Sequence, residues 1–369
     1  MERELVGEQH AELVYVCLGS SLPRYAISSL QFSAKATGFR VRVLADFAAP
    51  KEFPKELSWT VTSGFYREEL FVEFKNRSKL PGDFRNGFWL KTAERFFVLR
   101  DYLHHSDAKS LFHAELDVLV YSLQPLQQAV EESKLLGVFV PREAGDRVVA
   151  SLLYTNSVEA LDNLCAELIR RADQGNEMDI LGSLTGESSP WMHNLPTAEY
   201  LYRQHASARA EKPWPVVGGH LNMVIDGAVL GRWLYGVDPR NTKFAGTRNL
   251  IQQQKHTVPF DFPLKELKFD LNIRQKKLLV RRLDGPWNEV LAIHVHSKIH
   301  QKLSGRRAAR IIRRANELRE STIVRKELEW YGRGLSRLMK DAVLFTKSRV
   351  LRRSYFLRAK NRLIRWLDG

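Results

Sequence analysis

Hydrophobic and polar positions alternate between strand-like and helix-like periods along the N-terminal third of the chain. Apolar strand-like runs occur at 13–18 and 41–44, and the segment between them has the apolar spacing of a helix over 23–37. Pro23 fits the first turn of that helix, and Gly38 fits the position just after its end. A strand, a helix and a second strand in this order predict an open α/β sheet.

The same alternation continues to about residue 180. The pattern predicts a helix over 87–104, two strands over 135–140 and 148–154, and a helix over 158–172. Segments rich in Pro and Trp follow, and they are typical of ordered loops over the carboxyl edge of a sheet. We therefore expect one large α/β domain.

Two carboxylates interrupt the apolar run 111–121, which otherwise has the pattern of a buried strand. Glu115 and Asp117 are two residues apart, and side chains at that spacing point to the same face of an extended segment. An isolated buried charge is costly, so paired carboxylates in an apolar run indicate a counter-ion such as a divalent cation. The alternative is that both acids lie in a solvated loop.

Two further segments contain clustered polar residues. His294, His296 and Lys298 alternate along a strand-like segment and so share one face, where imidazole can ligate a metal and lysine can pair with phosphate. Glu177 and Asp179 begin an apolar helical stretch. The alternatives are a solvated strand face for the first segment and acids that favour the helix dipole for the second.

Residues near the first strand are candidates for holding a nucleotide. Leu18, Gly19 and Ser20 form the turn after that strand, where an open α/β sheet binds its ligand. The turn lacks a full glycine fingerprint, so a dinucleotide site is not indicated. The aromatic-rich helix further along is mostly core packing, although Lys91 or Arg95 can face a phosphate because such a helix borders the same crevice.

The order of these segments resembles that of GT-A-fold, DxD-type nucleotide-sugar glycosyltransferases of the bacterial surface-polysaccharide type, with a glycogenin-like motif order. HAELDVLVY is similar to their DxD strand, EMD to a D-Q-D motif, and HVHSK to a late motif with a His and a Lys. The segments 224–231 and 235–241 are also similar to parts of bacterial surface-polysaccharide enzymes. The chain departs from the pattern because Glu replaces the first Asp in both acidic motifs.

The resemblance implies a GT-A fold, a Rossmann-like open mixed sheet flanked by helices, over residues 1–304. It implies transfer of a sugar from a UDP- or GDP-linked donor to a glycan or lipid-linked acceptor. The cofactor would be Mn²⁺ or Mg²⁺, because carboxylates with one imidazole suit these ions, whereas a set without thiolates argues against structural zinc.

The resemblance also implies roles for individual residues. The ligands of the cation would be Glu115, Asp117 and either His296 or His294, and Lys298 would contact the diphosphate. The turn Leu18–Gly19–Ser20 would hold the base and ribose, and Glu115 would also face the nucleotide sugar. The candidate catalytic carboxylates are Asp179, Asp226 and Glu177, with Asp179 near the transferred sugar. An inverting enzyme would need Asp226 or Asp179 as a base, and the sequence leaves retaining and inverting chemistry both open.

Positive charge is concentrated at the C-terminal end. Residues 305–369 contain 19 Lys and Arg against 6 Asp and Glu, a net +13, which leaves +2 for residues 1–304. Val343, Val350, Leu357 and Ile364 recur every seven residues among the basic residues, which predicts a cationic amphipathic helical tail. We expect this tail to dock on an anionic membrane surface. Self-association, packing on the body and nucleic acid are the alternatives, and nucleic acid is disfavoured because the tail has no recognised nucleic-acid module.

The expected cellular compartment is inferred from the lack of a signal-peptide pattern and of a membrane-spanning run. The first ten residues lack a signal-peptide pattern, and no run approaches the ~20 apolar residues that span a bilayer. We therefore expect a cytoplasmic protein, peripheral on the inner face of the cell membrane. The competing class of function is a non-enzymatic adaptor that binds a membrane or nucleic acid through the tail.

Overall fold

A computed structural model of the chain describes residues 11–143, 147–187, 189–204, 215–235, 267–272, 277–282 and 285–295. The tail 305–369 with its predicted boundary, His296 and Lys298 lie outside these residues. The elements in chain order are β1 (Glu12–Cys17), α1 (Arg24–Thr37), β2 (Val41–Ala45), β3 (Ser58–Val61), η1 (Thr62–Gly64), α2 (Glu69–Arg77), α3 (Phe88–His105), β4 (Leu111–Ala114), β5 (Val118–Val120), α4 (Gln124–Ser133), β6 (Val138–Glu143), β7 (Arg147–Val148), β8 (Leu152–Thr155), α5 (Val158–Arg170), α6 (Glu177–Gly186), β9 (Met192–Leu195), α7 (Ala198–Gln204), β10 (Met223–Ile225), α8 (Val229–Tyr235), β11 (Leu267–Asn272), β12 (Lys277–Arg282) and β13 (Asn288–His294).

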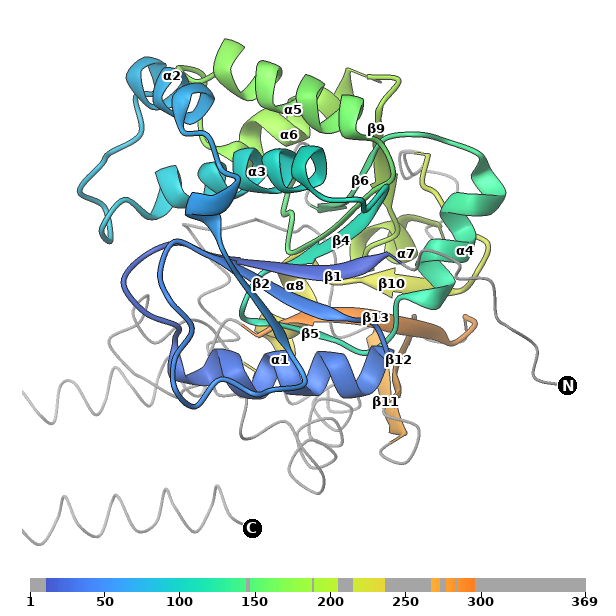
Figure 1. The fold of residues 1–369 in the computed structure, drawn as a ribbon. Coiled ribbons are helices and arrows are strands. Elements are labelled where there is room, and N and C mark those ends of the chain that lie inside the picture. Colours follow the sequence, from blue (N-terminus) through green and yellow to red (C-terminus); the bar gives the residue numbers. More distant parts are fainter. Residues whose placement is uncertain are drawn as a thin grey trace, which may run out of the picture. The chain divides into compact units, whose positions relative to one another are not determined.

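The described strands form two open sheets (Figure 1). The larger has the order β3-β2-β1-β4-β8-β6-β7, with β9 paired to β6. Its strands β3, β2, β1 and β4 are parallel, whereas β8 runs antiparallel to both β4 and β6. The smaller sheet has the order β10-β13-β12-β11, with β5 paired antiparallel to β13. The predicted fold class, an open mixed α/β sheet flanked by helices, is confirmed.

The first strand, helix and second strand lie where the hydrophobic pattern predicts them. Pro23 precedes α1, and Gly38 ends it in the left-handed conformation, with φ of 73° and its N–H donating to the carbonyl of Ala34 at 3.1 Å. This conformation strains most side chains but not glycine, which explains why the helix ends there.

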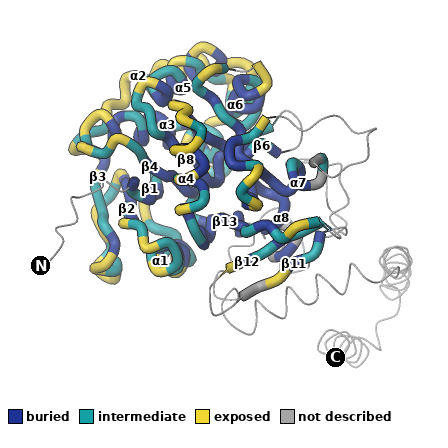
Figure 2. Tube along the Cα trace, turned by 90° about the vertical axis from the view of Figure 1, so that its right-hand side faces the viewer, coloured by how far each residue is buried: buried dark blue, intermediate teal, exposed yellow. Residues whose placement is uncertain are grey.

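The larger sheet separates two hydrophobic cores. On β1, Val14 packs into the core formed with α3 and α5, whereas its neighbours Leu13 and Tyr15 pack into the core formed with α1 and α4. Alternate side chains of a strand point to opposite faces, so a strand between two cores is apolar on both. Figure 2 shows the central strands as buried, while exposed residues lie mainly on helices and loops.

The apolar run 111–121 is not one strand. It divides into β4 in the larger sheet and β5 in the smaller sheet, and Glu115 and Asp117 lie in the turn between them. The Glu115 N–H donates to the carbonyl of Ser151 at 3.0 Å, and the Val118 N–H donates back to the Glu115 carbonyl at 2.9 Å, which closes a tight turn. The prediction of a continuous strand is therefore wrong, because strands buried on both faces have the same apolar pattern on either side of the turn.

Helix α1 fixes the position of β5. Ser29 donates its hydroxyl hydrogen to the Val118 carbonyl at 2.8 Å, and the hydroxyl oxygen of Ser33 accepts the Val120 N–H at 3.2 Å. Both serines are fully buried. Two hydroxyl groups on one face of α1 therefore bind the backbone of the short strand that follows the acidic turn.

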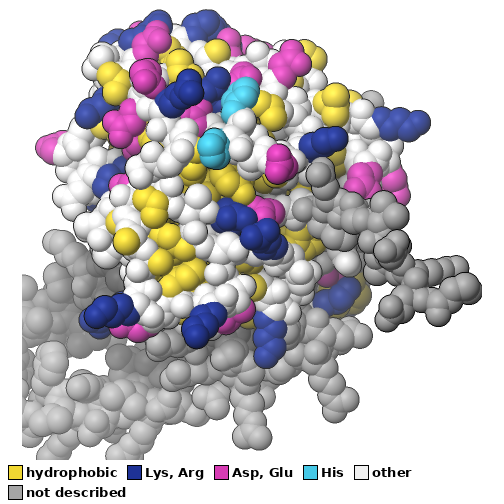
Figure 3. Space-filling view, in the orientation of Figure 1, with side chains coloured by type: hydrophobic (Ala, Val, Ile, Leu, Met, Phe, Trp, Pro, Cys, Tyr) yellow, Lys and Arg dark blue, Asp and Glu magenta, His cyan; other side chains and the backbone are white. Residues whose placement is uncertain are grey.

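Charged side chains of both signs are intermixed on the face shown in Figure 3. This agrees with the small net charge counted for residues 1–304. None of the helices in the described part of the chain combines the length and apolar character needed to cross a bilayer.

Replacing Ser33 by alanine tests the tie between α1 and β5. The change removes the oxygen that accepts the Val120 N–H, and a buried donor without an acceptor costs about 1–3 kcal/mol. Ser33→Ala should lower the free energy of unfolding by this amount in urea titrations. Ser28→Ala, the same change at an exposed position of the same helix, is the matched control. Equal stability of the two variants would contradict the tie.

Candidate metal centre

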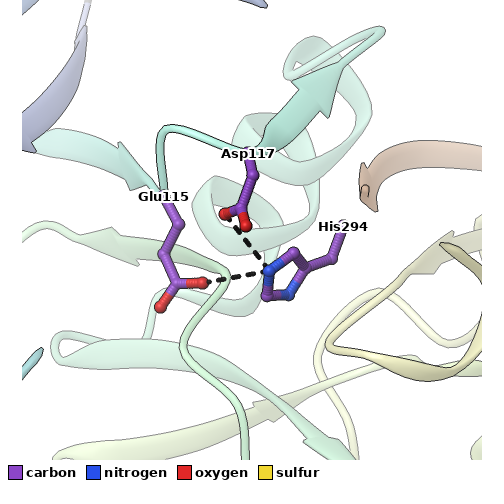
Figure 4. Close-up of side chains that lie close together, drawn as sticks. All are labelled: Glu115, Asp117 and His294. Atoms are coloured by element: carbon purple, nitrogen blue, oxygen red, sulfur yellow. Dashed lines mark ion pairs between the residues drawn. The ribbon is translucent and has the colours of Figure 1, made fainter. Parts of the chain in front are cut away.

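Three side chains converge where the two sheets meet (Figure 4). Glu115 and Asp117 lie in the turn between β4 and β5, and His294 is the last residue of β13, opposite Val118 of β5. The Nε2 atom of His294 lies 3.2 Å from Asp117 Oδ1 and 3.4 Å from Glu115 Oε2. One ligand atom of each residue lies within 4.8 Å of the others. Residues 177 positions apart in the chain therefore form one cluster.

Backbone hydrogen bonds hold the two halves of the cluster together. The Val295 N–H donates to the Asp117 carbonyl at 2.7 Å, directly after the last ladder pair of β5 and β13. The acidic turn and the end of β13 are thus joined by main-chain bonds, which do not depend on side-chain rotamers.

The ring of His294 is oriented by its other nitrogen. Nδ1 lies 2.8 Å from the carbonyl oxygen of Gly227, and because a carbonyl only accepts, Nδ1 carries the hydrogen. Nε2 consequently faces the two carboxylates. This is the usual arrangement of histidines that ligate metals, in which the second nitrogen donates to a fixed acceptor.

The charge of His294 depends on its carboxylate neighbours. Burial alone lowers the pKa of His294, but the carboxylates of Asp117 and Glu115 outweigh it and raise this pKa to about 9. At neutral pH and without a cation, the imidazole is therefore protonated and pairs with both acids. Two carboxylates and one imidazole also suit Mn²⁺ or Mg²⁺, and a bound cation would take the place of the Nε2 proton.

Arg95 of α3 lies between two of the predicted acidic residues. Its guanidinium forms an ion pair with Glu115 Oε1, and its Nη2 lies 4.0 Å from Glu177 Oε1. Lys91 or Arg95 was predicted to face a nucleotide phosphate, and the structure shows Arg95 paired with Glu115. One oxygen of Glu115 therefore faces Arg95 while the other faces His294.

Glu177 is a buried carboxyl group, and one of its oxygens has no hydrogen-bond partner. It begins α6, where the Asn176 side chain caps the helix by accepting the N–H groups of Met178 and Asp179. Only 2% of Glu177 is exposed, and burial raises its pKa to about 7 although Arg95 acts in the opposite direction. Its Oε2 is buried without a hydrogen-bond partner. An unpaired buried oxygen and a pKa near 7 are typical of functional sites.

The structure places the other two candidate catalytic residues differently. Asp179 forms an ion pair with Arg147 at 2.9 Å and is not part of the cluster of ligand atoms in the described residues. Asp226 is fully buried, and its two carboxylate oxygens accept the backbone N–H groups of Leu230, Gly231 and His294. These oxygens hold the backbone of β13 and of the segment after β10.

The predicted nucleotide turn lies beside Lys91. The Gly19 N–H donates to both oxygens of Asp46, at 2.9 and 3.0 Å. A Cβ at Gly19 would lie 3.7 Å from Lys91 Nζ, so α3 and the turn containing Leu18, Gly19 and Ser20 are neighbours. Sequence reasoning missed Asp46, although an acid directly after a parallel strand is a recognisable signal for this edge of a sheet.

Sequence reasoning also missed Glu143 and the Gly227 carbonyl. The Gly227 carbonyl contacts the His294 ring, and Glu143 accepts the N–H group of the same peptide unit. A backbone carbonyl has no sequence signal of its own. A charged residue in the strand-like run 138–143 was the one available sign, because β-strands buried on both faces are normally apolar.

No protein-family model and no curated protein sequence matches the chain. Solved structures similar to it include an active-site mutant of LgtC, at 14% identity and a TM-score of 0.37, covering 56% of this chain and 85% of that chain. The galactosyltransferase LgtC with donor and acceptor sugar analogues has 13% identity, a TM-score of 0.32 and the same coverage. Apo mouse xyloside xylosyltransferase 1 has 10% identity and a TM-score of 0.37, covering 50% of this chain and 85% of that chain. Because these TM-scores are below 0.5, function is argued from the site.

The pKa of His294 provides a direct test of the cluster. In the metal-free protein we expect NMR titration to give a pKa of about 9 for His294. Asp117→Asn should lower it, because one of the two carboxylates that raise it is lost. His113, whose pKa burial lowers to about 3, should stay neutral from pH 5 upward and serves as the internal reference.

The same shift sets the pH dependence of stability. The folded-state pKa lies above the unfolded value near 6.5, so the contribution of the ion pairs is complete below about pH 6.5. It is lost as the pH rises through about 9. Titration of His294 near 6.5 in both the parent and the Asp117→Asn protein would contradict the geometry of the cluster.

Proposed function

We propose that this protein is a metal-dependent glycosyltransferase that moves a sugar from a UDP- or GDP-linked donor to a glycan or lipid-linked acceptor. The observation that carries the proposal is the convergence of Glu115, Asp117 and His294 at the carboxyl end of β4. A partly buried cluster of two carboxylates and one correctly oriented imidazole is a chemically matched site for Mn²⁺ or Mg²⁺.

The position of the cluster in the sheet supports a nucleotide ligand. Along the sheet, β2 and β3 lie on one side of β1 and β4 lies on the other, so the strand order reverses between β1 and β4. The helices that follow β1 and precede β4, α1 and α3, lie on opposite faces of the sheet (Figure 1). Open α/β sheets bind ligands in the crevice at such a switch point. The Gly19 turn and the Glu115 turn directly follow β1 and β4, the two neighbouring strands at this switch point.

The residues at the crevice fit the charge of a nucleotide diphosphate. Asp117, Glu115 and His294 would hold the cation, which when bound stabilises the negative charge that develops on the departing diphosphate. Lys91 adds a positive charge beside the Gly19 turn. Asp117 is the principal carboxylate ligand in this proposal, because its Oδ1 lies 3.2 Å from His294 Nε2 whereas Glu115 Oε2 lies 3.4 Å away and the other oxygen of Glu115 pairs with Arg95.

Glu177 is the group placed to contact the transferred sugar. Its unpartnered Oε2 can accept a hydrogen bond from a sugar hydroxyl, and with a pKa of about 7 it can also donate one when protonated. Arg95 fixes its distance from Glu115, so the sugar and the cation would be held by one connected set of side chains.

The biological setting remains part of the proposal. A role in bacterial surface-polysaccharide synthesis and docking of the tail 305–369 on the inner face of the membrane are predictions from the sequence. The tail lies outside the described residues, so the structure does not bear on the adaptor alternative that depends on it.

Nucleotide binding tests the proposal. UDP or GDP together with Mn²⁺ should raise the melting temperature of the parent protein, whereas Asp117→Asn should lose most of this shift because its principal carboxylate is gone. Asp162→Asn is the matched control, since it removes a carboxylate paired with Arg100 on the outside of α3 and α5. It should respond like the parent protein. If neither nucleotide shifts the parent protein with Mn²⁺ or Mg²⁺, the transferase proposal is abandoned.

A further inference from the structure

Two carboxyl groups outside the cluster are fully buried. Glu143 is the last residue of β6, and Asp226 directly follows β10. Burying a carboxylate is costly unless its oxygens are hydrogen-bonded, and a pair of apolar side chains would usually stabilise a core as well. Their presence calls for a task other than packing.

Glu143 holds two successive peptide groups. Its Oε1 accepts the Gly227 N–H at 3.0 Å, and its Oε2 accepts the Ala228 N–H at 2.8 Å. The Ala228 N–H and the Gly227 carbonyl belong to the same peptide unit, which is planar and trans, so they point in opposite directions. By holding the N–H, Glu143 aims the Gly227 carbonyl away from itself.

That carbonyl is the acceptor for the imidazole of His294. The Nδ1 hydrogen of His294 is donated to the Gly227 oxygen at 2.8 Å, on the far side of the peptide from Glu143. Hydrogen bonding at the N–H end also polarises the peptide and strengthens its oxygen as an acceptor. Glu143 therefore acts on the ring of His294 through a single peptide group.

Asp226 holds the backbone of the same histidine. Its Oδ2 accepts the His294 N–H at 3.0 Å and the Gly231 N–H at 2.7 Å, while Oδ1 accepts the Leu230 N–H at 2.8 Å. The fit is close: a Cβ at Gly231 would lie 1.8 Å from the His294 carbonyl oxygen, an overlap that no side chain tolerates. The segment 226–231 thus contacts His294 at its amide, its carbonyl and its ring.

We propose that Glu143 and Asp226 are positioning residues that hold the His294 imidazole in the tautomer and orientation required for cation binding. The inference rests on the proposed function, because it assigns a purpose to these residues at the same metal centre. The inference also gives a role to the segment 226–231, DGAVLG. Asp226, Gly227 and Gly231 of this segment make the contacts with Glu143 and His294.

Metal affinity separates positioning from general stability. Mn²⁺ binding to the metal-free, full-length protein is measured from the electron paramagnetic resonance signal of free Mn²⁺. Glu143→Gln and Asp226→Asn keep the shape of each side chain but present an amide N–H₂ to a backbone N–H. We expect affinity to fall about 10–100-fold in each, the usual effect of losing a partner of a metal ligand. Glu12→Gln is the control, because Glu12 pairs with Arg42 at the start of β1 and should bind Mn²⁺ like the parent protein.

A second measurement uses the unmodified protein and does not depend on the variants folding. Nitrogen-15 NMR with saturating Mg²⁺ should show that His294 keeps its Nδ1 hydrogen and loses only the Nε2 hydrogen. Loss of the Nδ1 hydrogen overturns the inference, as does parent-like Mn²⁺ affinity in both Glu143→Gln and Asp226→Asn, or an equal loss in Glu12→Gln. In these cases the proposed function stands, whereas absence of Mn²⁺ and Mg²⁺ binding to the parent protein overturns both proposals.

Discussion

The pairing of β5 with β13 is the contact on which the rest of this site depends. Strand β5 is short, and it is held from one side by the hydroxyl groups of α1 and from the other by the ladder to β13. The ladder ends at His294, and the next backbone bond joins Val295 to Asp117. The acidic turn and the histidine are therefore brought together by main-chain hydrogen bonds. The side chains of Glu115 and Asp117 then reach the His294 ring.

The turn before β5 lets both carboxylates reach a partner on the second sheet, which a continuous strand would not allow. In a strand, Glu115 and Asp117 would each be flanked by buried apolar neighbours, with no partner from the second sheet. Because the chain turns at Glu115 and passes into the smaller sheet, both carboxylates face the end of β13 and share one imidazole. Arg95 balances part of the remaining charge from α3, so the buried acids are paired in the absence of a cation, as the cost of burying charge requires.

The sequence predicts the alternating elements well, because helix and strand periods are local and the capping residues Pro23 and Gly38 mark their ends. The sequence also identifies the three residues of the cluster as candidates, since carboxylates and histidines are conspicuous in apolar runs. That His294 faces the two carboxylates follows from the β5–β13 register, which no local pattern contains. The sequence also could not predict the break between β4 and β5 or the ion pair between Arg95 and Glu115. Both depend on which sheet each strand joins. Glu143 acts through a peptide group contributed by a segment more than 80 residues away, and a relation of that kind exists only in the folded chain.

The central claim is that Asp117 and His294 ligate one divalent cation at the junction of the two sheets. Anomalous X-ray diffraction from crystals grown with Mn²⁺ and UDP tests it most directly. The claim predicts a manganese peak in direct contact with an Asp117 carboxylate oxygen and His294 Nε2, with the diphosphate of the nucleotide on its open side. A manganese peak bound elsewhere, or a nucleotide bound in the crevice with no metal between Asp117 and His294, would contradict it.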